Sequence, residues 1–240
     1  LQVKLLAKSK LASIGELATG IAHEINQPLT FISSFFQNLE IKLESQELDT
    51  EKVLSRTHFG QKQLKKISEI ISHLRTFGRK SSVEFADIHI RQVLDNTLLL
   101  LQEKIRNRNI ELIIDVNKEL PVISGQANQL EQMFINLFQN ALDALSSRSD
   151  EALIQVKAYA DEDRMTILFS DNGCGIPDDQ LENIFTPFYT TKDVGQGTGL
   201  GLSIVYGIIN DHEGRIQCES TAGVGTTFNI KLPLKTREKG

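Results

Sequence analysis

The sequence predicts an α plus α/β fold: an antiparallel helical hairpin that forms a dimeric four-helix bundle, followed by an α/β sandwich. Two observations predict this fold. Up to about residue 80, apolar residues recur at spacings of three and four, which is the period of a helix. Beyond that point, short apolar segments alternate with amphipathic helical patterns, as they do in layered α/β domains. We therefore expect two domains, residues 1–80 and residues 81–240.

The first helical pattern covers residues 11–39 and keeps an unbroken heptad seam. A helix packed on its own domain has the same period, but a strict seam over so long a run favours a bundle or a coiled coil. The seam consists of Leu11, Ile14, Ala18, Ile21, Ile25, Pro28, Ile32, Phe35 and Leu39.

A second heptad stripe follows a polar turn near Ser45–Thr50. It consists of Val53, Gly60, Leu64, Ile67, Ile71 and Leu74. Two helices joined by a short loop form an antiparallel hairpin. One hairpin cannot cover both of its own seams, whereas two hairpins can, so we expect a homodimeric four-helix bundle.

His23 takes the outward f position of the first heptad pattern. A surface histidine without a role is the ordinary alternative. Here, however, Glu24 is adjacent and Pro28 follows inside the helix. Because Pro28 cannot donate a hydrogen bond to the carbonyl of Glu24 and its ring crowds that carbonyl, we expect a bend that costs about 3 kcal/mol. Such a cost in a helix interior indicates a purpose.

After a linker at Ser81–Ser82, the pattern predicts a mixed sheet with helices on one face. The predicted strands are Asp87–Ile90, Ile110–Val116, Ile154–Ala160, Met165–Ser170, Arg215–Ser220 and Thr226–Leu232. The predicted helices are Arg91–Arg106, Asn128–Leu145 and Leu202–Asp211. A glycine-rich region, Asp171–Gly201, precedes the last of these helices.

The composition argues against several classes of protein. A net charge of -5 gives no electrostatic reason to expect binding to nucleic acid or to a membrane surface. Two cysteines, Cys174 and Cys218, are too few for a disulfide framework and indicate a reducing compartment. The apolar runs are too short to span a bilayer. The chain begins at Leu1 inside a helical pattern, so we expect it to be a fragment of a longer protein.

Three polar residues share one face of the predicted helix Asn128–Leu145, within the segment NLFQNALDA. They are Asn136, Asn140 and Asp143. Simple amphipathicity is one explanation, although Glu or Lys would serve that purpose equally well. Amide oxygens also suit a hard cation such as Mg²⁺ that bridges phosphates.

Two glycine motifs allow a close approach of backbone to a ligand. DNGCGIP, Asp171–Pro177, has the chemistry of a tight turn, but Asp171 also offers an acceptor for the exocyclic amine of adenine. GQGTGLGLS, Gly195–Ser203, has four glycines at alternate positions and leads into a helix whose free N–H groups suit phosphate. It lacks the lysine of a Walker A loop. A third motif, GVGTTF at Gly223–Phe228, reads alone as a turn into a strand.

Taken in order, the motifs resemble the conserved boxes of the sensor histidine kinases of two-component systems. HEINQPL is similar to their H box, NLFQNALDA to the N box, DNGCGIP to the G1 box, and GQGTGLGLS to the G2 box. FTPFYTTK, Phe185–Lys192, is similar to the F box, and GVGTTF to the last glycine motif. The resemblance covers the chain from about Lys8 to Pro233, and its HEINQPL form is closest to a subgroup that senses nitrogen status or dicarboxylates.

This resemblance implies an ATP-dependent protein-histidine kinase, with a dimerisation and histidine-phosphotransfer domain before an ATP-binding domain of the gyrase, Hsp90 and kinase type. His23 corresponds to the phospho-acceptor and Glu24 to its acid/base partner. Asn140 corresponds to the residue that holds Mg²⁺ through the phosphates, assisted by Asn136. The adenine site corresponds to Asp171, Gly173, Gly175 and Thr226, and the phosphate site to Lys192, Gly197, Gly199 and Gly201. Residues 178–199 correspond to a lid anchored by Phe185 and Phe188.

The same resemblance implies a homodimer that uses ATP and Mg²⁺, passes the phosphoryl group to the receiver domain of a response regulator, and forms the cytoplasmic portion of a membrane-anchored sensor. Any membrane contact is expected through a missing N-terminal region. Gln27 departs from the commoner Thr or Asn of relatives, which leaves a phosphatase activity open, and Asp143 replaces a common lysine. The alternative is a non-catalytic dimeric scaffold that binds ATP, although such a protein would be expected to lose His23 or Asn140.

Overall fold

The computed structural model describes residues 22, 25–45, 49–78, 85–146, 151–192 and 198–235. It divides into two compact units, Leu1–Arg79 with Pro187–Leu200, and Lys80–Thr186 with Gly201–Gly240. Among the helices of the described residues, none combines the length and the apolar character that crossing a bilayer requires. His23, Glu24 and Gly197 lie outside the described residues.

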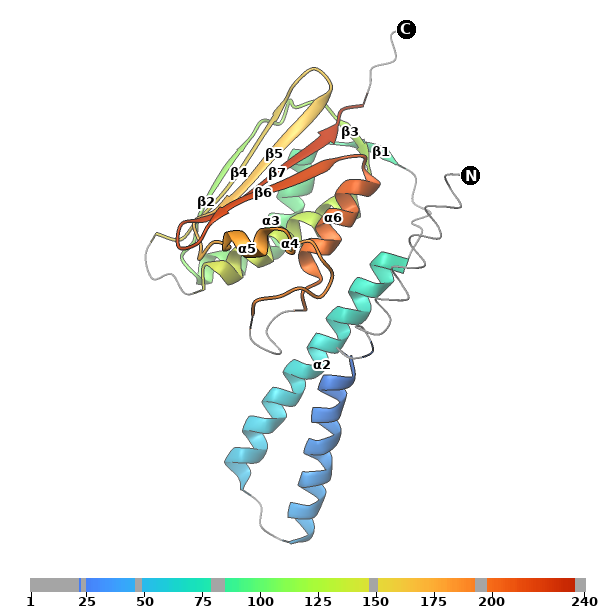
Figure 1. Ribbon diagram of the computed structural model, residues 1–240, viewed down its shortest axis with the longest axis vertical. Coiled ribbons are helices and arrows are strands. Elements are labelled where there is room, and N and C mark those ends of the chain that lie inside the picture. Colours follow the sequence, from blue (N-terminus) through green and yellow to red (C-terminus); the bar gives the residue numbers. More distant parts are fainter. Residues whose placement is uncertain are drawn as a thin grey trace. The chain divides into compact units, whose positions relative to one another are not determined.

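The first unit contains a helix over residues 25–44 and the helix α2, Thr50–Gly78 (Figure 1). The two helices face each other through aromatic rings, because Phe31 packs edge-on against Phe59 with ring centroids 4.5 Å apart. The predicted helical hairpin is therefore confirmed for the described residues. The described part of the first seam is confirmed as well, since Pro28 and Phe35 are buried while Ile25, Ile32 and Leu39 are half-buried, and the seam positions before Ile25 lie outside the described residues.

The predicted stripe of α2 is partly confirmed, because Gly60 is buried and Val53 and Ile67 are half-buried, but two of its positions differ by one residue. Leu64 and Ile71 of the stripe are 54% and 53% exposed, whereas their neighbours Gln63 and Ile70 are 8% and 0% exposed. A single hairpin buries the face that turns toward its one neighbour, whereas a heptad seam faces the centre of a complete bundle. Within one chain, the apolar residues of α2 are therefore only partly covered.

The second unit is an α/β sandwich. Its strands are β1 (Ala86–Ile88), β2 (Glu111–Val116), β3 (Ile123–Gly125), β4 (Leu153–Ala160), β5 (Arg164–Asp171), β6 (Arg215–Thr221) and β7 (Gly225–Pro233). Its helices are α3 (Ile90–Asn107), α4 (Ala127–Ala144), α5 (Asp178–Leu181) and α6 (Gly201–Asp211).

The main sheet of this unit is mixed and has the strand order β2-β4-β5-β7-β6. Strands β2 and β4 are parallel, while the other neighbours are antiparallel. Figure 1 shows α3, α4 and α6 together on one side of this sheet. Burial alternates along β7, where Thr226, Phe228, Ile230 and Leu232 are buried and face the helical layer. The predicted mixed sheet with helices on one face is therefore confirmed.

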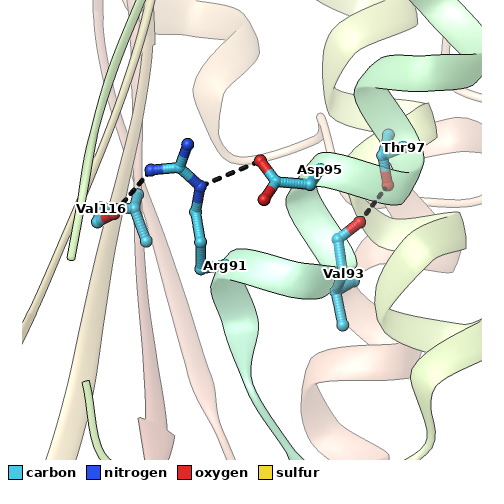
Figure 2. Close-up of polar contacts among 5 residues, drawn as sticks. All are labelled: Arg91, Val93, Asp95, Thr97 and Val116. Carbon is cyan, nitrogen blue, oxygen red and sulfur yellow. Dashed lines mark hydrogen bonds and ion pairs between the residues drawn. The ribbon is translucent and has the colours of Figure 1, made fainter. Parts of the chain in front are cut away.

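Helix α3 is tied to the edge strand β2 by an arginine near its first turn. Arg91 donates from Nη1 to the carbonyl oxygen of Val116 at 2.9 Å, and its Nε forms an ion pair with Asp95 at 2.9 Å (Figure 2). One turn further, the Thr97 hydroxyl donates to the carbonyl oxygen of Val93 at 2.9 Å, so this buried polar group is satisfied inside the helix.

Three predicted details of the sandwich were wrong or incomplete. Ile90 does not extend the first strand, because it is the first residue of α3 and is buried there. Strand β3 was not predicted, since its three residues carry no measurable alternation. Helix α5 was not predicted either, because it is a single turn inside the glycine-rich region.

Candidate functional site

The C-terminal half of α4 carries two amide side chains with unused hydrogen-bonding capacity. Asn136 is buried and its Oδ1 accepts a hydrogen bond from Gln132 Nε2 at 3.3 Å. The Nδ2 atoms of Asn136 and Asn140 are buried without a hydrogen-bond partner among the described residues. Because buried amide groups are nearly always paired, these two Nδ2 donors are suited to a ligand that offers acceptor atoms. As hydrogen-bond donors they fit the oxygen atoms of a phosphate, whereas a metal ion would bind an amide oxygen.

Asp171 ends β5 in a largely apolar setting. Burial raises the pKa of this carboxyl group to about 6, although backbone N–H groups of Gly173 and Thr226 lower it in part. The Gly173 N–H donates to Asp171 Oδ1 at 2.9 Å. Across the sheet, Asp171 is paired in register with Thr226 of β7. A carboxylate held in this way remains a strong acceptor for a ligand that can donate a hydrogen bond.

The loop after Asp171 needs glycine at two positions. A Cβ atom on Gly173 would lie 2.7 Å from the Cβ atom of Ala144, so a side chain there would push the loop away from α4. Gly175 has a φ of +66, and a Cβ atom on it would lie 2.1 Å from the carbonyl oxygen of Thr221. The two glycines therefore allow the loop to pass between the end of α4 and the end of β6.

A pair of hydroxyl groups adjoins Asp171. Thr226 is buried, and its Oγ1 lies 3.0 Å from Ser220 Oγ. Ser220 donates to the carbonyl oxygen of Gly225 at 2.8 Å and accepts from the Ile176 N–H at 2.8 Å. Sequence analysis gave Ser220 no role, although its inward alternation with Cys218 on the predicted strand was a signal that could have indicated one.

The predicted motifs of the second unit meet along α4. The Cys174 N–H donates to the carbonyl oxygen of Ala144 at 3.1 Å, which fixes the Asp171 loop to the end of that helix. One turn earlier, the Asn140 amide lies 3.7 Å from the place where a Cβ atom on Gly201 would be. Gly201 begins α6, and the N-terminal end of a helix is suited to an anion. The structure thus brings Asp171, Asn140 and Gly201 into one continuous site along α4.

The glycine-rich region is divided between the two units, because Pro187–Leu200 belongs to the first unit and the residues on either side belong to the second. In the second unit, the Phe185 ring packs on Tyr206 of α6, with centroids 5.6 Å apart. In the first unit, Gly199 has a φ of +63, and its carbonyl oxygen accepts the Phe188 N–H at 2.9 Å. A Cβ atom on Gly199 would lie 2.3 Å from the Phe188 carbonyl carbon, so this contact requires glycine. Lys192 is exposed.

Of the predicted functional residues near His23, only Gln27 and Pro28 are described. Gln27 is exposed on the first helix, and Pro28 is buried within it. The Thr30 hydroxyl donates to the carbonyl oxygen of Asn26 at 2.8 Å, so the helix continues through the proline with local side-chain support. The second unit's Asp143, to which no role was given, accepts at Oδ1 from Gln139 Nε2 at 2.9 Å.

Family models match both parts of the chain. The His Kinase A (phospho-acceptor) domain matches residues 13–82, and the Histidine kinase-, DNA gyrase B-, and HSP90-like ATPase family matches residues 125–236. The first match includes the segment around His23 and the described hairpin. The second includes Asn140, Asp171 and Gly201, which form the continuous site along α4.

Curated relatives and solved structures agree with these matches. Sporulation kinase E of Bacillus subtilis is 34% identical over 98% of this chain, which covers 30% of that protein. Sensor protein FixL of Bradyrhizobium diazoefficiens is 33% identical over 97% of this chain, which covers 46% of that protein. The chain thus spans less than half the length of either relative.

Two structures of histidine kinase ThkA are similar to the chain. Its catalytic domain is 32% identical with a TM-score of 0.56, covering 63% of this chain and 97% of that domain. ThkA in complex with the response regulator protein TrrA is 27% identical with a TM-score of 0.75, covering 97% of this chain and 65% of the other. From these matches and the site along α4, the chain belongs to the sensor histidine kinases and comprises their catalytic core.

Proposed function

We propose that this chain binds ATP, transfers the γ-phosphoryl group to His23, and passes it on to an aspartate of a response regulator. The observation that carries the proposal is the run of contacts from the Asp171 loop through Ala144 to Asn140 and Gly201. It aligns an acceptor for an adenine amine with amides and a helix N-terminus suited to phosphates. The matching ATPase family supports the use of ATP.

The adenine end of the site consists of Asp171, Gly173, Gly175 and Thr226. In this proposal the ionised Asp171 carboxylate accepts a hydrogen bond from the exocyclic amine of the base. The two glycines keep side chains out of the space beside the loop. Thr226 supports the carboxylate from the paired strand, since its backbone N–H group donates to Asp171. A base with a carbonyl oxygen in place of the amine would set acceptor against acceptor.

The family resemblance assigns the phosphate end to Asn136, Asn140, Lys192 and the glycines 197, 199 and 201, and we adopt that assignment. Asn140 would hold Mg²⁺ through the phosphates with help from Asn136, and the unpaired Nδ2 donors of both residues support contacts to the phosphate oxygens. A bound Mg²⁺ would neutralise phosphate charge. Lys192 would add a further positive charge, and the start of α6 would donate backbone N–H groups.

Transfer requires His23 as a neutral imidazole, because only the neutral ring has a lone pair free to attack phosphorus. One ring nitrogen forms a bond to the γ-phosphorus while the bond to the bridging oxygen of ADP breaks. The other ring nitrogen then sheds a proton or carries charge. Glu24, the next residue, takes that proton or stabilises the charge, as a positioned general base does. The outward f position that the heptad pattern predicts for His23 would leave it open first to the ATP-binding domain and then to a receiver domain.

The proposed assembly is a homodimer in which residues 1–80 form the bundle and residues 81–240 the ATP-binding domain. Exposed apolar side chains on the described hairpin support it, because they are suited to burial against a second hairpin. They are Leu29, Phe36, Ile41, Leu43, Leu54, Phe59, Leu64 and Ile71. The complex of ThkA with a response regulator protein supports a receiver domain as the second partner. We further propose that the chain is the cytoplasmic portion of a membrane-anchored sensor.

Incubation with γ-labelled ATP tests the proposal. Wild-type chain should take one acid-labile and alkali-stable label, because a phosphoramidate has that stability and a serine ester the opposite. His23→Gln preserves side-chain length, so it should bind ATP and take no label. His58→Gln, at an exposed histidine of α2, is the matched control and should be labelled normally. Acid-stable label in His23→Gln would contradict the proposal, and ATP binding without label in the wild type would favour the non-catalytic scaffold.

A further inference from the structure

His212 is a buried histidine that joins the far ends of α4 and α6. It directly follows α6, is 2% exposed, and lies beside the Phe85 ring with centroids 5.2 Å apart. Its Nε2 is 3.0 Å from the backbone nitrogen of Gln126, and its Nδ1 is 2.7 Å from the carbonyl oxygen of Ile208. Both ring nitrogens of this side chain are therefore used inside the second unit.

These contacts fix the protonation state of the ring. A backbone amide only donates, so Nε2 must accept from the Gln126 N–H and carries no proton. A carbonyl oxygen only accepts, so Nδ1 carries the proton and donates it to Ile208. Burial lowers the pKa of His212, which agrees with this neutral form. The ring is thus one specific tautomer that accepts from one helix while bonded to the other.

The acceptor contact satisfies the start of α4. Gln126 is the N-cap of that helix and makes no side-chain cap hydrogen bond. The N–H groups at the start of a helix have no partner within it and need one from elsewhere. His212 supplies that partner for Gln126. The same ring therefore accepts a hydrogen bond from the N-cap of α4 and donates one to the last turn of α6.

The two helices meet again at their other ends, where the candidate site lies. Asn140 is near the C-terminal end of α4, and it faces Gly201, the first residue of α6. The helices thus run antiparallel and pack along their length (Figure 1). Since close-packed interiors transmit strain, a change at the His212 end should alter the spacing between Asn140 and Gly201.

We propose that His212 is a positioning residue that sets the register of α6 against α4 and thereby the geometry of the phosphate end of the site. This inference rests on the proposed ATP site. His212 touches no nucleotide, and it acts only through the placement of Asn140 and Gly201. The adenine end is independent of it, because Asp171 and Thr226 are held by the sheet pairing of β5 with β7.

The proposal predicts a selective effect on binding. His212→Phe keeps a ring beside Phe85 but removes the acceptor for Gln126. It should weaken MgATP binding about tenfold or more, as misplacement of binding groups does, while adenosine affinity changes less than about twofold. His212→Gln restores an acceptor near the position of Nε2 and should recover most of the MgATP affinity. Both affinities are measured by titration calorimetry on the full chain.

A second pair of variants tests the same contact without changing His212. A Cβ atom on Gly125 would lie 2.8 Å from His212 Cδ2 and 2.9 Å from Nε2, so Gly125→Ala should push the ring away from Gln126. It should reproduce the selective loss of MgATP affinity. Gly207→Ala on α6 is the matched control, because a Cβ atom there meets nothing within 4 Å, and it should bind as the wild type does.

The outcomes separate this inference from the proposed function. A wild-type chain that does not bind MgATP contradicts the ATP site itself. If the wild type binds, and both His212→Phe and Gly125→Ala lose affinity for MgATP and adenosine equally or lose neither, the positioning role is overturned. If His212→Phe does not fold, the positioning role is tested with Gly125→Ala and His212→Gln. The measure is again the change in MgATP affinity relative to the change in adenosine affinity.

Discussion

Replacement of Asp171 by asparagine should abolish tight ATP binding and yet stabilise the nucleotide-free chain. Burial raises the pKa of Asp171 from 3.8 to about 6, so ionisation of this group is harder in the folded than in the unfolded chain. Each pKa unit corresponds to about 1.4 kcal/mol, so the ionised carboxylate costs the folded state about 3 kcal/mol as an upper value. Asparagine has the same shape and no charge to bury.

The pH at which this penalty acts follows from the direction of the shift. Below pH 3.8 the carboxyl group is protonated in both states, and it costs nothing. As the pH rises from about 4 to about 6, the unfolded chain gains by ionisation while the folded chain keeps its proton, so stability is lost. Above pH 6 the loss is complete. Asp171→Asn should therefore be more stable than wild type by about 1–3 kcal/mol at pH 8 and by almost nothing at pH 4.

The assay is urea unfolding of the two proteins without nucleotide at several pH values, followed by tyrosine fluorescence, together with ATP titrations. In the wild type, ATP affinity should fall about tenfold per pH unit below pH 6, because the carboxylate becomes protonated. The Asp171→Asn variant serves as the control. Its weaker ATP affinity should change with pH only through the titration of ATP itself, without the part that comes from Asp171. Wild-type ATP affinity in the variant, or lower stability than wild type at pH 8, would refute the assigned role of Asp171.

The remaining predictions concern the base, the cysteines and the phosphatase activity. ATP should bind much more tightly than GTP, by up to about 10⁴, and equal affinities in calorimetry would count against the Asp171 contact. Cys174 is exposed, and bound MgATP should shield it from alkylation. Burial raises the pKa of Cys218 to about 12, so Cys218 should react slowly with or without MgATP. Peptide mass mapping after alkylation measures both rates. Gln27→Ala should keep autophosphorylation and lose hydrolysis of a regulator's aspartyl phosphate, and loss of both activities would instead indicate a structural defect.

The elements that could be predicted from sequence were those with long periodic patterns. The helical period of α4 put Asn136 and Asn140 on one face, and both have Nδ2 atoms without a hydrogen-bond partner among the described residues. The alternation along β5 and β7 predicted those strands, and their pairing set Asp171 opposite Thr226. Local patterns are sufficient in these cases because each side chain's direction depends only on its own helix or strand.

The contacts between remote segments could not be predicted in the same way. Neither the approach of Gly173 to Ala144 nor the bond from Gln126 to His212 leaves a periodic signal, because each depends on how two finished elements pack. The one-residue difference between Leu64 and Gln63 has a similar origin. The heptad pattern shows which positions are apolar. The position of the neighbouring helix decides which of them are buried within a single hairpin.

The pairing of β5 with β7 has a consequence for the folding of the second unit. Asp171 and Thr226 are far apart in the sequence, and β7 is the last strand of the described chain, so the adenine end is complete only after this strand has joined the sheet. ATP would then bind the finished domain and not its unfolded chain. At a concentration one hundred times its dissociation constant, such a ligand stabilises the folded state by about 2.7 kcal/mol. ATP would thus act on this domain as a folding ligand as well as a substrate, and chains depleted of ATP should unfold or be degraded sooner.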